Sequence, residues 1–166
     1  MASIAAHLRD ILILPFTVTV IVPYFNYDRN DYRIPETVYL KVLGLIIGLA
    51  GLALFFYTVF LFKTVGKGTL APWSEKQKLV VRGPYRYCRN PMITGVLFIL
   101  IGEALALHSV SIFVWAFCFF IINTTYFLLS EEPALDKKFG EDYKEYKKHV
   151  SRWIPRLTPY RQNQAS

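Results

Sequence analysis

The stretch VLGLIIGLAGLALFFYTVFLF, residues 42–62, contains no charged residue. An α-helix rises about 1.5 Å per residue, so a block of about 20 apolar residues matches the thickness of the hydrocarbon core of a bilayer. Three further apolar blocks cover residues 11–22, 92–107 and 110–129. Of the 166 residues, 54% are hydrophobic, which is high for a water-soluble domain of this size. The sequence therefore predicts an all-α integral membrane protein.

The four blocks predict a single membrane-embedded domain over residues 1–166, a bundle of four transmembrane helices at about residues 5–25, 40–62, 91–107 and 110–130. The first block is short, and Tyr24, Phe25 and Tyr27 extend it as an aromatic belt at the membrane interface. A cleavable signal peptide over residues 1–22 is the alternative for this block. The sequence VPY that follows it does not resemble a small-residue cleavage site.

The net charge of +7 is distributed in a way that indicates a membrane rather than nucleic acid. The loop between the first two spans is acidic on balance. The loop between the second and third spans has seven Lys or Arg residues against Glu75 alone, and eight follow the fourth span. Because basic loops stay on the inner side of the membrane, both basic segments and both termini are expected in the cytoplasm. That membrane would be the plasma or inner membrane of a prokaryote, or the endoplasmic reticulum of a eukaryote.

The third and fourth predicted spans are separated only by a tight turn at His108 and Ser109, so they must form an antiparallel hairpin. The start of the third span and the end of the fourth then share one membrane level. Arg89 and Glu131 are expected to meet there. Two interpretations stay open: a structural ion pair that closes the hairpin, or groups that flank a pocket for a charged small molecule.

Beyond the fourth span, apolar residues recur at helical spacing and predict a cytosolic amphipathic C-terminal helix over about residues 131–150. These residues are Leu135, Phe139, Tyr143, Tyr146 and Val150. Pro133 is expected to kink this helix at the membrane boundary, since proline removes one backbone hydrogen bond. The helix is expected to lie on the membrane surface.

Glu103 is the one carboxylate within a predicted span, and an intramembrane acid is by default a functional candidate. A structural role near the outer turn, in which Glu103 shares a proton or water with His108, is the interpretation we favour. Neither the histidines nor Cys88 and Cys118 have metal-ligand spacing, so no metal site is expected, and both cysteines are expected to be small apolar fillers. A small four-span transporter or scaffold, with Glu103 as its coupling site, is the competing non-enzymatic function.

Three motifs resemble one known group of proteins. GKGT (residues 66–69), GPYRYCRNPMITG (83–95) and SEEPALDKKFGEDYKEYKKHVSRWIP (130–155) are similar to the isoprenylcysteine carboxyl methyltransferase and phospholipid N-methyltransferase superfamily of integral membrane proteins. The likeness covers roughly residues 40–157. It implies an enzyme that binds S-adenosyl-L-methionine on the cytosolic side, releases S-adenosyl-L-homocysteine, and receives a lipophilic acceptor from the bilayer.

The same resemblance assigns roles to individual residues. Arg89, Asn90 and Pro91 meet the superfamily's R-[HN]-P signature, although many members have His where Asn90 stands. The chemistry of donor and acceptor, rather than the resemblance, suggests the catalytic residues: Arg89 for the carboxylate of the donor and Glu132 for a proton of an ammonium head group. The implied cofactor contacts are Gly68, Thr69, Leu79, Val80, Tyr85, Asn90, Pro91, Met92 and Glu131. Among them, Glu131 suits the ammonium or ribose hydroxyls, and Tyr85 with Leu79 and Val80 suits the adenine.

The acceptor is less well defined by the sequence. Carboxyl-methylating relatives place an arginine about one turn before the acidic pair, where this chain has Phe127, and no Lys or Arg occurs in residues 90–136. A carboxylate acceptor would need such a cation, so a lipid amine head group or another lipophilic nucleophile is expected. Carboxyl methylation of an isoprenylcysteine-like substrate is the alternative.

Overall fold

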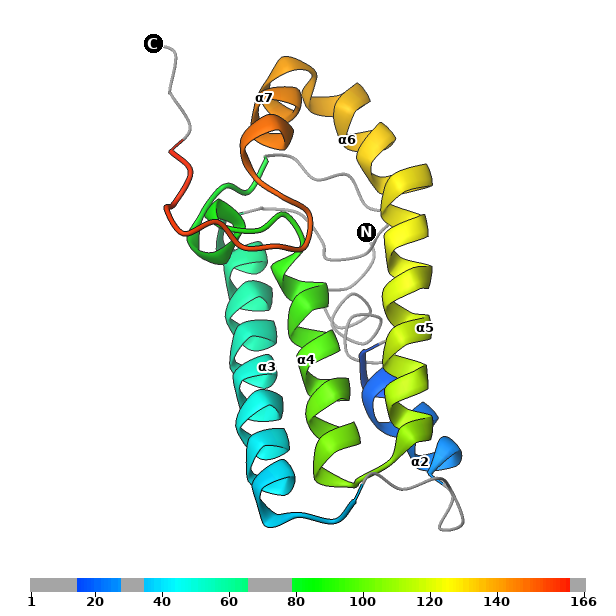
Figure 1. The fold of residues 1–166 in the computed structure, drawn as a ribbon. Coiled ribbons are helices and arrows are strands. Elements are labelled where there is room, and N and C mark those ends of the chain that lie inside the picture. Colours follow the sequence, from blue (N-terminus) through cyan, green and yellow to red (C-terminus); the bar gives the residue numbers. More distant parts are fainter. Residues whose placement is uncertain (1–14, 28–34, 66–78, 162–166) are drawn as a thin grey trace.

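The computed structural model of the protein describes residues 15–27, 35–65 and 79–161. Every regular element in these residues is helical, which confirms the all-α expectation (Figure 1). The elements are a π-helix Thr17–Ile21, α2 Val22–Asn26, α3 Val38–Val65, a 3-10 helix Gly83–Arg86, α4 Pro91–Ala106, α5 Val110–Tyr126, a π-helical turn Phe127–Glu131, α6 Glu132–Phe139 and α7 Glu141–His149.

Among the residues that the structure describes, two helices are long and apolar enough to cross a membrane, Val38–Leu61 and the continuous run Val110–Phe139. The helix α4 has 16 residues, a length of about 24 Å, which is less than the roughly 30 Å hydrocarbon core. Thr17–Asn26 is shorter still, and the first part of the predicted span 5–25 lies outside the described residues. The four-span count therefore stays a prediction.

The helices α3 and α4 pack with their backbones in direct contact. A Cβ atom built on Gly102 would lie 2.6 Å from the carbonyl oxygen of Gly44, and one built on Gly51 would lie 2.7 Å from the carbonyl oxygen of Gly95. No side chain fits in such a space. Small residues at helix interfaces permit this close approach within membranes, where helices associate by packing rather than by the hydrophobic effect.

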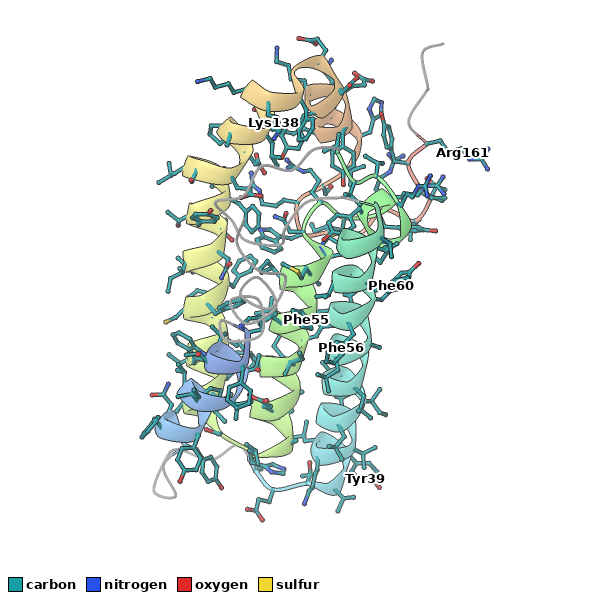
Figure 2. All side chains as sticks on the ribbon, turned by 180° about the vertical axis from the view of Figure 1, so that it is seen from behind. Tyr39, Phe55, Phe56, Phe60, Lys138 and Arg161 are labelled. Carbon is teal, nitrogen blue, oxygen red and sulfur yellow. The ribbon has the colours of Figure 1, made fainter. Side chains whose placement is uncertain are left out.

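An apolar core lies where α4 meets α3 and α5, with Phe55, Leu100, Ala116 and Phe119 among its buried residues. The opposite face of α3 exposes large apolar side chains, including Phe56 at 57% and Phe60 at 60%. Figure 2 labels both on this helix and shows Tyr39 at one end of the bundle and Lys138 at the other. An exposed apolar face of this kind is expected of a helix surrounded by lipid.

The predicted hairpin of α4 and α5 is confirmed. His108 lies in the turn with a φ of 54°, and Ser109 caps α5 by accepting a hydrogen bond from the backbone N–H of Ile112 (3.4 Å). The ring of His108 was expected to share a proton or water with Glu103. In the structure its Nε2 contacts Thr37 instead, whose backbone N–H lies 3.3 Å away.

The sequence predicted one continuous amphipathic helix over residues 131–150, but the structure has two short helices there. Gly140 interrupts the helix with a φ of +53°, a left-handed conformation that favours glycine, and separates α6 from α7. The two short helices fold over one end of the bundle (Figure 1). Their apolar residues do not lie on a surface, because Tyr143, Tyr146 and Val150 form a buried cluster with Leu79 and Val81 packed against it.

The bend between α5 and α6 agrees with the expected effect of Pro133. This residue lacks the N–H that would bond to the carbonyl four residues earlier, and a π-helical turn, Phe127–Glu131, ends two residues before it.

Beyond α7 the chain turns back and runs along residues 82–90, which we call the arginine loop. We call residues 150–161 the strap, and the arginine loop, α6, α7 and the strap together form the cap of the bundle.

Candidate functional site

Three charged side chains meet where the cap joins the hairpin. Arg89 Nη1 donates to Glu132 Oε1 at 2.9 Å, and Arg152 Nε donates to the same oxygen at 2.7 Å. The side chains of Arg89, Glu132 and Arg152 are 10%, 11% and 19% exposed. Two guanidiniums against one carboxylate leave this charged cluster formally positive. It is therefore suited to hold an anionic group of a ligand.

The local structure explains how Arg89 and Glu132 meet. Arg89 lies in the arginine loop two residues before Pro91, which begins α4, and Glu132 is the first residue of α6. The hairpin brings these two positions to one level, as predicted. Arg89 was expected to meet Glu131, but in the structure it donates to the next residue, Glu132. The π-helical turn that ends at Glu131 holds more residues than an α-helical turn and so rotates the face that this acidic pair presents.

The strap supplies Arg152, and the sequence interpretation did not single out this residue. The backbone N–H groups of Arg89, Arg156 and Tyr160 donate to the carbonyls of Ser151 (2.9 Å), Tyr87 (3.0 Å) and Arg86 (2.9 Å), respectively. Arg86 Nε also donates to the carbonyl of Tyr160 at 2.7 Å. These bonds hold the strap along the arginine loop over most of its length.

Several buried donors around the charged cluster have no hydrogen-bond partner among the described residues. They are Arg89 Nε, Asn90 Nδ2 and Trp153 Nε1. Leaving a buried donor unsatisfied costs about 1–3 kcal/mol, so such groups are rare in proteins without a functional reason. Arg89 and Asn90 are adjacent in the chain, and Trp153 follows Arg152. A ligand with oxygen or nitrogen acceptors would satisfy donors of this kind.

Asn90, Pro91 and Met92 begin α4 as the resemblance implies. Asn90 is the N-cap residue but its side chain makes no capping bond, and its backbone carbonyl accepts from the backbone N–H of Thr94 at 3.1 Å. Pro91 is buried in the first turn, and Met92 packs against the core around Phe55. Only Asn90 of these three therefore presents an unsatisfied polar group.

The residues expected around the adenine belong to the interior of the cap. Val80 and Tyr85 are each 7% exposed. Leu79 packs against the buried cluster that contains Tyr143 and Tyr146. Gly68 and Thr69 lie outside the described residues, and Glu131 is half-buried at the end of the π-helical turn.

Tyrosines surround the charged cluster and are held in their neutral form. Arg89 Nη1 lies 3.4 Å from the hydroxyl of Tyr143, and the hydroxyl of Tyr146 donates to the carbonyl of Tyr85 at 2.5 Å. Burial raises the pKa of Tyr143 to about 12, and the negative charge of Glu132 adds to this shift. Burial also raises the pKa values of Tyr85 and Tyr146, and each shift is larger than that of Tyr143. These hydroxyls therefore serve as hydrogen-bonding groups rather than as bases near neutral pH.

A pocket of about 430 Å³ lies elsewhere on the cap and contains none of the predicted site residues. Residues of α7 and the strap line it: Asp142, Glu145, His149, Arg156, Pro159, Tyr160 and Arg161. Most of these side chains are exposed. One lining residue, Arg156, also has a buried donor, Nη1, without a hydrogen-bond partner among the described residues, but Arg89, Asn90 and Trp153 do not line this pocket.

Long apolar helices with a buried charged cluster at one end are the features of a membrane-associated helical protein. The chain belongs to the phospholipid methyltransferase family, which matches residues 39–142. The match contains Arg89 and Glu132 but ends before Arg152. A protein of Haemophilus influenzae that carries the description "Uncharacterized protein" is 30% identical over 63 residues, which are 38% of this chain and the whole of that protein. Family membership implies a methyltransferase that acts on a membrane substrate.

Proposed function

We propose that this protein transfers a methyl group from S-adenosyl-L-methionine to a membrane-soluble acceptor, within one membrane-embedded domain. The observation that carries the proposal is Arg89, nine-tenths buried beside Glu132, with an Nε that has no acceptor among the described residues. The carboxylate of the methyl donor is an acceptor that fits it. The family supports methyl transfer, and the apolar helices support an acceptor that enters from the lipid.

The other polar groups of the donor fit residues near Arg89. Glu131 suits the ammonium or the ribose hydroxyls, and Asn90 Nδ2 is a buried donor for a further ligand oxygen or nitrogen. Leu79, Val80 and Tyr85 suit the adenine, and Gly68 and Thr69 are proposed as their neighbours. When bound, the donor supplies an electrophilic methyl group on a sulfonium. The residues of this chain orient it and exclude water, which favours a displacement that discharges the sulfonium.

The two ion pairs of Glu132 support a role in orienting Arg89 better than a role as a proton acceptor. Both guanidiniums donate to Oε1, so two charge-assisted hydrogen bonds already occupy this oxygen. Glu132 then fixes the side chain of Arg89 in one position.

The proposed topology places four spans in the membrane and both termini in the cytoplasm, with the donor bound on the cytosolic side. We propose a lipid amine head group or a similar lipophilic nucleophile as the acceptor. A second candidate is carboxyl methylation of an isoprenylcysteine-like substrate. Arg152 supports this candidate. Residues 90–136 contain no Lys or Arg, and the fold brings the cation of Arg152 to Glu132 within that segment.

Isothermal titration of the detergent-solubilised protein with S-adenosylhomocysteine tests the activity class. Binding is expected, and Arg89→Ala and Glu131→Ala should each weaken it at least about tenfold through the loss of charge-assisted hydrogen bonds. Arg161→Ala removes an exposed arginine at the end of the strap and serves as the matched control. No binding at millimolar ligand would favour a transporter or scaffold instead. Unchanged affinity in both variants would place the site elsewhere.

A labelled methyl donor separates the two acceptor classes. Membranes that contain the protein should transfer the label to a lipid-soluble product. A methyl ester releases labelled methanol in mild base, whereas an N-methyl product keeps its label. The N-methyl result is the one expected here.

A further inference from the structure

Arg152 lies ten residues beyond the region that the family matches, yet its guanidinium is part of the charged cluster. Its Nε donates to Glu132 Oε1 at 2.7 Å, closer than Arg89 Nη1 at 2.9 Å. This hydrogen bond, together with the charge of Glu132, raises the pKa of Arg152 above its ordinary value. The site is therefore built from two separate parts of the chain, the hairpin and the strap.

The backbone around Arg152 is fixed from two sides. On one side, Ser151 accepts from the N–H of Arg89, and Cys88 Sγ donates to the carbonyl of Arg152 at 3.4 Å. On the other side, the ring of Trp153 packs against α5 and the π-helical turn after it, with ring centroids 5.2 Å from Phe120 and 6.1 Å from Phe127. Arg152 thus reaches Glu132 from a rigid support rather than from a free tail.

The position of Arg152 determines what Arg89 can offer a ligand. A carboxylate often binds one arginine through two parallel hydrogen bonds, which would use two nitrogens of Arg89. Here Arg152 shares Oε1 of Glu132, and Arg89 reaches that oxygen through Nη1 alone, while its Nε has no acceptor among the described residues. The cluster retains a positive charge and a buried donor, and both favour an oxyanion.

We propose that Arg152 is a positioning residue for the methyl donor: it holds Glu132 against Arg89 so that Arg89 presents Nε to the donor's carboxylate. This inference rests on the proposed function. A phosphate of a lipid head group has the same oxyanion chemistry, so the test must distinguish these two sources. It must also distinguish positioning from a general effect on folding.

The test compares two ligands that differ only in the carboxylate, S-adenosylhomocysteine and its decarboxylated form, S-adenosyl-3-thiopropylamine. Titrations use the full chain and its variants Arg152→Ala, Arg152→Lys and Arg161→Ala. The original protein should bind S-adenosylhomocysteine at least about tenfold more tightly than the decarboxylated form. Arg152→Ala should remove most of this preference and leave the affinity for the decarboxylated form within about twofold. Arg152→Lys should restore part of it, since lysine keeps the charge without the planar fork, and Arg161→Ala should change neither affinity.

Glu132→Gln adds a check that the effect passes through Glu132. In that background, Arg152→Ala should change the affinity for S-adenosylhomocysteine by less than about twofold, because the residue through which Arg152 acts is already altered. Titrations are run well below the unfolding temperature of each variant, so that a loss of folded protein does not imitate a loss of affinity.

Three results would overturn the inference while leaving the proposed function intact. One is a full carboxylate preference in Arg152→Ala. Another is an equal weakening of both ligands, which indicates a structural role. The third is unchanged binding of both ligands with a raised KM for the lipid acceptor, which indicates contact with a lipid phosphate. If the original protein bound neither ligand, the proposed function would fall and this inference with it.

Discussion

Arg89 Nη1 lies 2.9 Å from Glu132 Oε1, although 43 residues separate them in the chain. The α4–α5 hairpin accounts for this proximity, since Arg89 precedes its first helix and Glu132 follows its second. Their ion pair closes the open end of the hairpin, and Arg152 joins it from the strap. The contribution of this cluster to folding can be measured separately from its contribution to ligand binding.

Glu132→Gln should destabilise the protein strongly. The substitution removes the one carboxylate between two nearly buried guanidiniums, and breaking a buried ion pair from one side costs about 3–5 kcal/mol. Thermal or denaturant unfolding in detergent measures the loss. Glu145→Gln is the control, since Glu145 is 52% exposed in its pair with Lys148, and exposed pairs contribute about 1 kcal/mol or less. Equal losses in both variants would show that the charged cluster does not stabilise the fold.

Gly102→Ala should weaken the contact between α3 and α4. Its Cβ would lie 2.6 Å from the backbone of Gly44 and Gly48, so the helices must separate, and overpacking of this kind costs about 1–3 kcal/mol. Gly48→Ala is a matched control, because its Cβ would lie 3.8 Å from the nearest atom, an ordinary contact. Unfolding in detergent should show a loss for the first variant and none for the second. The reverse order would contradict this packing.

The protein should lose stability in alkaline solution partly through Tyr143. Its pKa is raised from 10.0 to about 12 in the folded state, chiefly by burial, so deprotonation favours the unfolded chain between these values. This part of the stability is complete below about pH 10 and is lost as the pH rises toward 12. The free energy of unfolding measured from pH 9 to 11 should fall less steeply in Tyr143→Phe. Identical slopes would show that Tyr143 ionises freely.

Trp153→Ala should loosen the strap without affecting the α3–α4 pair. The substitution removes the ring that packs against Phe120 and Phe127. Hydrogen exchange should then accelerate at the amides of Arg156 and Tyr160, which bond to the arginine loop, while amides within α3 keep their protection. Ile154→Ala, at a side chain that is 76% exposed in the same strap, should leave exchange unchanged. Uniform acceleration across the molecule would indicate global rather than local destabilisation.

Much of the fold could be predicted because the apolar runs are long and their junctions short. The turn at His108 and Ser109 leaves no alternative to a hairpin, and the hairpin in turn predicts that Arg89 meets an acidic residue. Which acid it meets depends on the π-helical turn Phe127–Glu131, because the wider turn rotates the acidic pair about the helix axis. The sequence pattern therefore identified the acidic pair but not which of its two residues bonds to Arg89.

Two features had readable signals that the sequence interpretation did not use. Gly140 stands inside the predicted C-terminal helix, and glycine is the most common residue at the end of a helix. Gly44 and Gly48 are four residues apart in an apolar helix, a spacing typical of close helix packing. Arg152 stands inside the third quoted motif, residues 130–155, but its contact with Glu132 depends on the strap folding back along the arginine loop.

The order of the chain also determines the order in which the charged cluster can assemble. Arg152 lies 20 residues after Glu132 and beyond all the apolar helices. While the ribosome is still adding the strap, the hairpin can already close through Arg89 and Glu132, and this pair is electrically neutral. The nascent protein acquires its surplus cation only after Ser151 and Arg152 have emerged and docked. Assembly from hairpin to strap would therefore delay ligand capture until both helices of the hairpin have been synthesised.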